Sequence, residues 1–196
     1  MKPLYSTDPL ATALYWMTIV VWIVSELSAF FRGVTIAHDR RQDRRSGPVL
    51  IGFLLLAVWL GGILAAVVPG AAITAGRSAV FGFGLLLALA GIALRQYAIA
   101  SLGRYFTVRV MTRPDQTVVE RGPYRFVRHP SYSGSLLTVL GVLLCSTNWL
   151  ALACFVLALP GFLYRIRVEE RVLLDALGEP YRAYMGRTKR LVPFLV

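Results

Sequence analysis

Long apolar runs separated by shorter polar stretches make up most of the chain. A helix that crosses a membrane needs about 20 apolar residues. Three runs are long enough, namely Leu10–Phe31, Val49–Pro69 and Ser78–Leu94, and we expect the third to continue toward Leu102. A fourth block, Ser131–Tyr164, contains no charged residue. This pattern predicts an all-α integral membrane protein.

The fourth block is interrupted by the polar residues of Cys145–Asn148, which are followed by Trp149, a residue type common at membrane interfaces. We therefore predict a tight helical hairpin of two short spans, which gives five transmembrane helices in all. One long, kinked span is the alternative. At 196 residues the chain fits a single domain, 1–196, with three N-terminal spans in 1–102 and two more in 103–196.

Basic residues are distributed unevenly along the chain. Of the 21 Lys and Arg residues, 19 fall in the segments 32–46, 95–130 and 165–190, and Lys2 and Arg77 are the other two. Basic residues favour the cytoplasmic side of a membrane. This predicts a multi-pass protein of the cell inner (cytoplasmic) membrane, with the N-terminus outside and the C-terminus cytoplasmic. Both polar stretches described below would then lie on the cytoplasmic face.

Composition narrows the choice of partners. The apolar fraction is 57%, above the roughly 45–50% of soluble domains, and the net charge is +11. Because the basic residues lie between apolar runs, membrane lipids are the expected partners and nucleic acid is not. No metal is expected, since Cys145, Cys154, His38 and His129 show no ligand spacing. Glu26 is either a functional acid within the first span or an interfacial residue near Arg32.

The first polar stretch, residues 103–130, cannot form one long helix because glycine and proline interrupt it. Irregular backbone of this kind leaves N–H and C=O groups available for a polar ligand. Thr107–Met111 and Thr117–Val119 are candidates for short extended pieces. His129-Pro130 starts the next span, whose amino end suits a carboxylate or another anion. His129 itself has three possible roles, as a general base, a cofactor ligand or a structural residue.

The second polar stretch follows the last span. Nothing terminates a helix after Tyr164, so we expect it to continue as RIRVEERVLLDAL and to stop at Gly178. Arg165 and Glu169 are four residues apart and share one face of this helix. They form either a solvated ion pair or part of a site at the membrane surface. The basic tail, residues 181–193, is able to fold back over that site.

In order and approximate spacing, the chain contains GPYRFVRHPSYSG, the hairpin, R-x-R-x-EE-x-x-L, G-x-x-Y-x-x-Y and TKRLVP. From Gly103 to the C-terminus this combination resembles the isoprenylcysteine carboxyl methyltransferase and phospholipid methyltransferase family. The resemblance implies that 103–196 is the cofactor-binding and catalytic region of a methyltransferase. It also implies S-adenosyl-L-methionine in a cytoplasmic pocket and a lipophilic small-molecule or prenylated substrate that enters from the bilayer.

By the same resemblance, Arg165 and Glu169 would be catalytic. The residues that would bind the cofactor are Gln116, Val118, Val119, Gly122, Tyr124, Arg128, His129, Pro130, Tyr132 and Glu170. Gln116 departs from the pattern, because the eukaryotic enzymes have histidine there.

Methyl transfer needs in-line positioning more than covalent help. A carboxylate acceptor is already ionised, and Arg165 would orient it while Glu169 holds Arg165 or favours the cationic sulfonium. An amine acceptor, as in phospholipid N-methylation, would instead need a base such as His129 or Glu169. The NADPH-dependent membrane sterol reductases share the motif around RHPSY and are a further alternative. A channel would require more polar residues within the spans.

Overall fold

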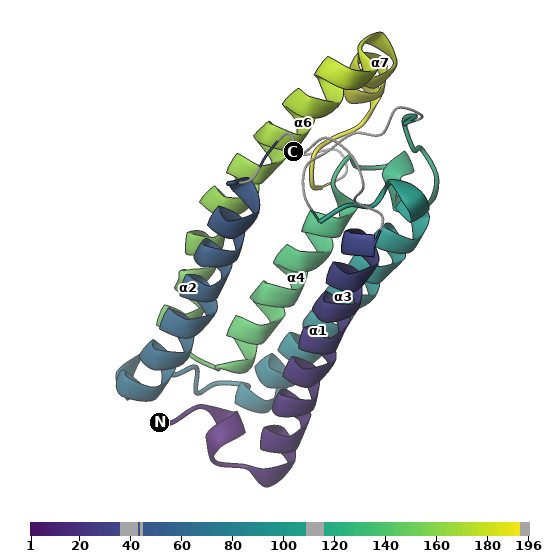
Figure 1. The fold of residues 1–196 in the computed structure, drawn as a ribbon. Coiled ribbons are helices and arrows are strands. Elements are labelled where there is room, and N and C mark those ends of the chain that lie inside the picture. Colours follow the sequence, from purple (N-terminus) through teal and green to yellow (C-terminus); the bar gives the residue numbers. More distant parts are fainter. Residues whose placement is uncertain (36–42, 44, 109–115, 193–196) are drawn as a thin grey trace.

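The computed structural model describes residues 1–35, 43, 45–108 and 116–192, and these residues are largely helical (Figure 1). The α-helices are α1 (Pro9–Thr35), α2 (Ser46–Val67), α3 (Arg77–Leu102), α4 (Pro130–Cys145), α5 (Trp149–Ala153), α6 (Leu159–Leu177) and α7 (Glu179–Arg187). Short 3-10 turns cover Leu4–Ser6, Pro69–Ala71, Gly103–Tyr105, Gly122–Arg125 and Cys154–Ala158. Thr117–Val119 forms no strand, and residues 109–111 of the other expected extended piece lie outside the described residues.

Four stretches are long and apolar enough to cross a membrane, and they are Pro9–Gly33, Ser46–Val67, Arg77–Tyr105 and Trp149–Leu177. The chain is therefore a multi-pass, helical membrane protein. Helix α4 is also apolar, but it has only 16 residues and rises about 24 Å, less than the roughly 30 Å of a bilayer's hydrocarbon core. Five spans remain a prediction that depends on α4.

The fourth apolar block forms a hairpin, as the sequence predicts. Helix α4 ends at Cys145, and Thr147 adopts a positive φ of 47°. The side chain of Asn148 caps α5 by accepting hydrogen bonds from the backbone N–H groups of Leu150 (2.9 Å) and Ala151 (3.1 Å). The returning arm is not one regular helix, because the 3-10 turn Cys154–Ala158 separates α5 from α6.

Helices α3 and α4 lie side by side with their backbones in close contact (Figure 1). A Cβ atom on Gly91 of α3 would lie 2.5 Å from the backbone nitrogen of Thr138, and one on Gly141 of α4 would lie 2.4 Å from that of Ala88. Small residues allow membrane helices to pack this closely. The glycines therefore fix where the amino end of α4 lies relative to α3.

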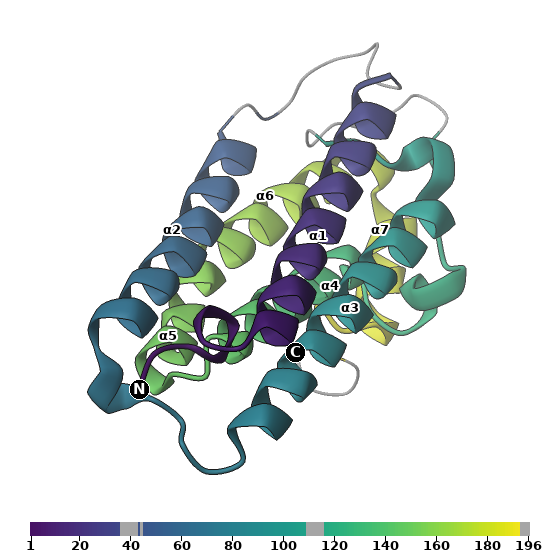
Figure 2. The ribbon, with the colours of Figure 1, turned by 90° about the horizontal axis from the view of Figure 1, so that it is seen from below.

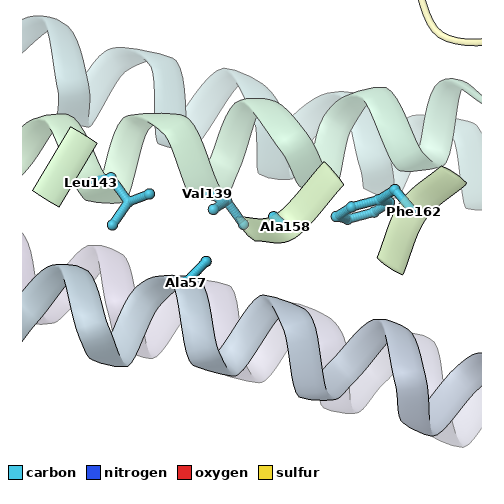
Figure 3. Close-up of a cluster of buried hydrophobic side chains, with 5 residues drawn as sticks. All are labelled: Ala57, Val139, Leu143, Ala158 and Phe162. Carbon is cyan, nitrogen blue, oxygen red and sulfur yellow. The ribbon is translucent and has the colours of Figure 1, made fainter. Parts of the chain in front are cut away.

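A buried apolar cluster connects α4 and the returning arm with α2. Ala57 of α2 points toward Val139 and Leu143 of α4 (Figure 3). Ala158, the last residue of the turn before α6, and Phe162 of α6 complete the cluster. Helix α1 packs mainly on α3 and on the turn Leu4–Ser6, and it stands apart from α2 (Figure 2).

Candidate functional site

A cavity of about 670 Å³ opens between α1 and α2 and extends to the amino end of α4. Its walls along α1 and α2 are largely apolar and include Ile19, Trp22, Ile23, Leu27, Leu50, Leu54 and Val58. Its other end is polar and is lined by residues of both polar stretches, among them Arg128, His129, Tyr132, Arg165 and Glu169. This shape suits a ligand, or a pair of ligands, with one polar and one apolar part.

The basic tail folds back onto the first polar stretch, as expected from the sequence. The backbone N–H of Arg128 donates to the carbonyl of Lys189 (2.7 Å), and that of His129 donates to the carbonyl of Arg190 (2.9 Å). The hydroxyl of Ser133 donates to the carbonyl of Leu191 (2.5 Å). The tail therefore covers the start of α4 on the side where the cavity is polar.

Glu170 anchors this arrangement from α6. Its carboxylate lies 2.9 Å from Nε of Arg128 and accepts two hydrogen bonds from Arg190, at 3.0 and 2.9 Å on Oε2. Its side chain is buried. Arg128 also donates to the backbone carbonyls of Met185 and Thr188. Glu170 thus joins the first polar stretch, α6 and the tail, and its side chain does not line the cavity.

Arg165, Tyr132 and Glu169 form a connected set at the polar end of the cavity. Nε of Arg165 donates to the Tyr132 hydroxyl (3.1 Å), which donates to Oε2 of Glu169 (2.6 Å). The Glu169 side chain is 29% exposed and faces the cavity. Within the described part of the chain, no lysine or arginine pairs with Glu169, whose nearest basic nitrogen is Nδ1 of His129 at 4.0 Å.

Arg165 is held by groups that sequence reasoning missed. Its Nη1 donates to the hydroxyl of Ser46 (2.7 Å) and lies 3.7 Å from the carboxylate of Asp43, and its Nη2 donates to the carbonyl of Val108 (2.7 Å). No motif marks these three residues, because each lies far from Arg165 in sequence. The guanidinium therefore connects α2, α4, α6 and the loop after α3.

Asp43 also organises the start of α2. Burial alone would raise its pKa. Hydrogen bonds from the Ser46 hydroxyl and from the backbone N–H groups of Arg45 and Ser46, together with nearby Arg165, outweigh that effect and lower the pKa. Asp43 therefore stays negatively charged beside Arg165 at neutral pH.

His129 is buried at the amino end of α4 and stacks on Tyr132, with ring centroids 5.5 Å apart. Its Nε2 lies 3.4 Å from Glu170 but has no hydrogen-bond partner within the described residues. The His129 ring lines the cavity, whereas its Nε2 lies next to Glu170, which does not line it.

The residues expected to bind a cofactor fall into two groups. Seven line the cavity, namely Gln116, Val118, Val119, Tyr124, Arg128, His129 and Tyr132. Gly122, Pro130 and Glu170 do not line it and shape the backbone or the ion pairs around it.

Tyr184 of α7 holds Tyr124 in place. Desolvation raises the pKa of Tyr184 to about 12, so its hydroxyl stays protonated and donates to the carbonyl of Tyr124 (2.7 Å).

Of the two alternatives for Glu26, the structure does not support a position beside Arg32. Its two carboxylate oxygens pair with Nε and Nη2 of Arg95 on α3, at 2.5 and 2.7 Å. Arg32 donates instead to the side chain of Gln96 (2.5 Å). Glu26 and Arg32 are six residues apart, so their side chains point to different sides of α1.

Comparisons with known proteins point to one family. Residues 84–175 match the model of the isoprenylcysteine carboxyl methyltransferase (ICMT) family. Protein-S-isoprenylcysteine O-methyltransferase B of Arabidopsis thaliana is 37% identical over 117 residues, which are 58% of this chain and 59% of that protein. The Saccharomyces cerevisiae protein-S-isoprenylcysteine O-methyltransferase is 34% identical over 115 residues, 57% of this chain and 48% of that protein.

The chain therefore matches about half to three fifths of the length of these relatives. The structure of a eukaryotic intramembrane Ras methyltransferase ICMT superposes with a TM-score of 0.63 and 19% sequence identity. That superposition covers 97% of this chain and 70% of the other. At this identity it shows a shared fold.

Proposed function

We propose that this chain is a member of the isoprenylcysteine carboxyl methyltransferase family and that it transfers a methyl group from S-adenosyl-L-methionine to the carboxylate of a lipophilic, isoprenyl-type acceptor. The observation that carries the proposal is the position of the Glu169 carboxylate and its lack of a basic partner. This carboxylate accepts a hydrogen bond from Tyr132, lines the polar end of the cavity, and has no lysine or arginine partner within the described residues. Such a group suits a cationic ligand.

The residues present fit the cofactor. S-adenosyl-L-methionine combines a polar adenosine and amino-acid frame with a sulfonium centre, and it supplies the methyl group when bound. The polar end of the cavity offers Arg128, His129 and the Tyr132 ring for such a frame. A second hollow of about 460 Å³ lies between residues 116–120 and the α6–α7 junction, and it shares Gln116, Thr117, Val118 and Leu177 with the first. We assign Gln116 and Val118 to the cofactor side of the site.

Arg165 would orient the acceptor. Arginine has five N–H donors in a planar fork that matches a carboxylate. Tyr132, Ser46 and Val108 hold the guanidinium in place, so it loses little freedom when an acceptor arrives. The carboxylate would take the remaining N–H groups or replace one of these partners. Because a carboxylate is already ionised, no strong base is required.

The cavity walls would bind the lipophilic tail of the acceptor and keep water away from the reacting groups. The apolar surfaces of α1 and α2 would receive the acceptor's tail from the bilayer, and the folded tail at residues 188–191 would exclude water from the other side. Exclusion of water strengthens charge contacts and desolvates the attacking carboxylate. We further propose that the protein resides in the cytoplasmic membrane with this site on the cytoplasmic face, in agreement with the distribution of its basic residues.

The proposal is tested with the purified protein in detergent or nanodiscs. Calorimetry should detect S-adenosylhomocysteine and not NADPH, and the reverse result would favour a reductase. With radiolabelled cofactor and an isoprenyl thioether acid, the product should release its label as methanol in base, since a methyl ester is hydrolysed there. A base-stable product formed from a lipid amine would contradict carboxyl transfer and support N-methylation.

A further inference from the structure

Asp43, which precedes α2, contacts Arg165 without lining the cavity. Its carboxylate lies 3.7 Å from Nη1 of Arg165, and its side chain is 13% exposed. Arg165 lines the cavity, whereas Asp43 and Ser46 do not. A ligand in the cavity can therefore reach the guanidinium, and the charge of Asp43 acts on it from outside the cavity.

The Ser46 hydroxyl connects the two charged groups. Ser46 is fully buried, donates to the carboxylate of Asp43 and accepts from Nη1 of Arg165 (2.7 Å). A hydroxyl has a single proton, so the bond to Asp43 leaves only oxygen lone pairs for Arg165. Hydrogen bonds in such a chain strengthen one another. Asp43 therefore holds Arg165 through Ser46 as well as by direct attraction.

Asp43 also balances the charge of Arg165. Within the described residues it is the one carboxylate that forms an ion pair with Arg165, and Glu169 reaches the guanidinium only through the Tyr132 hydroxyl. The lowered pKa of Asp43 keeps it negatively charged at neutral pH. An acceptor carboxylate would therefore meet an arginine whose charge is partly offset.

Arg165 still has N–H groups for an acceptor. In the described part of the chain, its bonds to Tyr132, Ser46 and Val108 use one N–H on each nitrogen, and a guanidinium has five. One N–H then remains on each terminal nitrogen, which suits the two oxygens of a carboxylate.

The proposed reaction neutralises the acceptor. A carboxylate oxygen forms a bond to the methyl carbon, the carbon–sulfur bond breaks and its electron pair stays on sulfur, so no proton moves. An interaction that is stronger with the ionised acceptor than with the transition state slows this step. The orientation that Arg165 provides is needed throughout, but its full charge would favour the ionised acceptor.

On the basis of the proposed function, we propose that Asp43 is a positioning residue that holds Arg165 through Ser46 and offsets part of its charge, so that Arg165 orients the acceptor carboxylate without binding it too tightly to react. Asp43 lies outside residues 84–175, the part of the chain that matches the family model. The N-terminal half thus contributes to the reacting end as well as to the apolar walls.

Asp43→Asn removes the charge and keeps the hydrogen bonds. Asparagine caps helix starts about as well as aspartate, so the contacts with the backbone N–H groups of Arg45 (3.1 Å) and Ser46 (3.0 Å) can remain. With an isoprenyl thioether acid as acceptor, KM and kcat should both fall, each by about tenfold, the effect of one nearby charge. Calorimetric affinity for S-adenosylhomocysteine should not change. A raised KM would overturn the proposal, because a merely structural role weakens acceptor binding.

Calorimetry with the acid and with its methyl ester separates charge from shape, and it needs no cofactor. The ester has the same tail and no charge. Asp43→Asn should raise the affinity for the acid about tenfold and leave the affinity for the ester unchanged. An unchanged or lower ratio of the two affinities would refute the role of Asp43.

Two further variants complete the test. Ser46→Ala keeps the charge of Asp43 and removes a group that holds Arg165, so KM for the acid should rise while kcat falls, and a lowered KM would contradict the proposal. Asp8→Asn is the matched control, because Asp8 accepts from the backbone N–H of Ala11 (2.7 Å) at the start of α1. It should keep both constants, and the same change there as in Asp43→Asn would count against a specific role of Asp43.

Failure of the proposed function would look different. If the wild type transfers no label to the acid, carboxyl methylation is wrong, and the ratio of acid to ester affinity then decides the role of Asp43 alone. A ratio that rises in Asp43→Asn would support this role, and equal ratios in the variant and the wild type would refute it.

Discussion

Two adjacent acids on α6, Glu169 and Glu170, have opposite surroundings. Glu170 is buried between Arg128 and Arg190, whereas Glu169 faces the cavity and accepts a hydrogen bond from Tyr132. The sequence marks both as functional but cannot separate them, since adjacent helical residues point about 100° apart and only the packing of the tail decides which is enclosed. The structure makes Glu169 the acid able to meet a cationic ligand and Glu170 the one that holds the tail.

Glu169→Gln should therefore weaken binding of the charged cofactor selectively. S-adenosyl-L-methionine carries a sulfonium charge that S-adenosylhomocysteine lacks. Near a low-dielectric membrane, loss of the facing carboxylate should lower affinity for S-adenosyl-L-methionine by about tenfold and leave affinity for S-adenosylhomocysteine nearly unchanged. Calorimetry with both ligands measures this. Asp175→Asn, an exposed acid on the same helix, should change neither affinity, and equal loss of both ligands in Glu169→Gln would show that the residue is structural.

Arg165→Lys should lower turnover far more than cofactor affinity. Lysine cannot form the planar, two-pronged contact with a carboxylate, and loss of one such transition-state contact costs on the order of a hundredfold in rate. Because Arg165 also bonds Ser46 and Val108, thermal unfolding should be recorded for each variant at the same time. Arg167→Lys, exposed on the same helix, is the control. Near-normal turnover in Arg165→Lys would show that Arg165 only connects helices and does not orient the acceptor.

Among the elements, the pair α3 and α4 determines where the site forms. Their glycine contacts place the amino end of α4, with His129 and Tyr132, against α3 and the first polar stretch. Apolar runs were enough to predict these helices, and Gly178 was enough to predict where α6 stops. The break at Cys154–Ala158 was not predictable, because its sequence is as apolar as the helices on either side.

Gly91→Ala should loosen this contact. The added Cβ would lie 2.5 Å from the backbone nitrogen of Thr138 and 2.6 Å from the carbonyl of Gly134, which cannot move without separating the helices. Overpacking of this kind typically costs about 1–3 kcal/mol, so the thermal unfolding midpoint in detergent should fall. Gly82→Ala adds the same atom on the same helix where no atom lies within 4 Å, and it should not lower the midpoint. Equal behaviour of the two variants would show that α3 and α4 do not depend on backbone contact.

For the whole molecule, the sequence predicted more of the polar region than of its attachment to the N-terminal spans. The motifs from Gly103 onward have their own spacing, and the fold brings Arg128, His129, Tyr132, Arg165 and Glu169 to one cavity. Of the partners from the N-terminal half, Ser46 ends a polar loop and Glu26 lies within an apolar run. Hydropathy does not reveal which distant charge each of them meets.

The arrangement of the chain in the membrane is the last property to test. Arg77 donates to the carbonyl of Lys2, and Ala72 pairs with Asn148, so the N-terminus, the α2–α3 connection and the hairpin turn share one end of the bundle. The positive-inside rule predicts that this end lies outside.

Single cysteines test this orientation. Thr74→Cys and Trp149→Cys, at exposed positions of the same end, should react with a membrane-impermeant thiol reagent in intact cells. Glu179→Cys, on exposed α7, should react only after permeabilisation. The natural Cys145 and Cys154 are buried and provide the background. Labelling of Thr74→Cys without Trp149→Cys would show that α4 does not cross the bilayer, and labelling of Glu179→Cys alone in intact cells would invert the orientation.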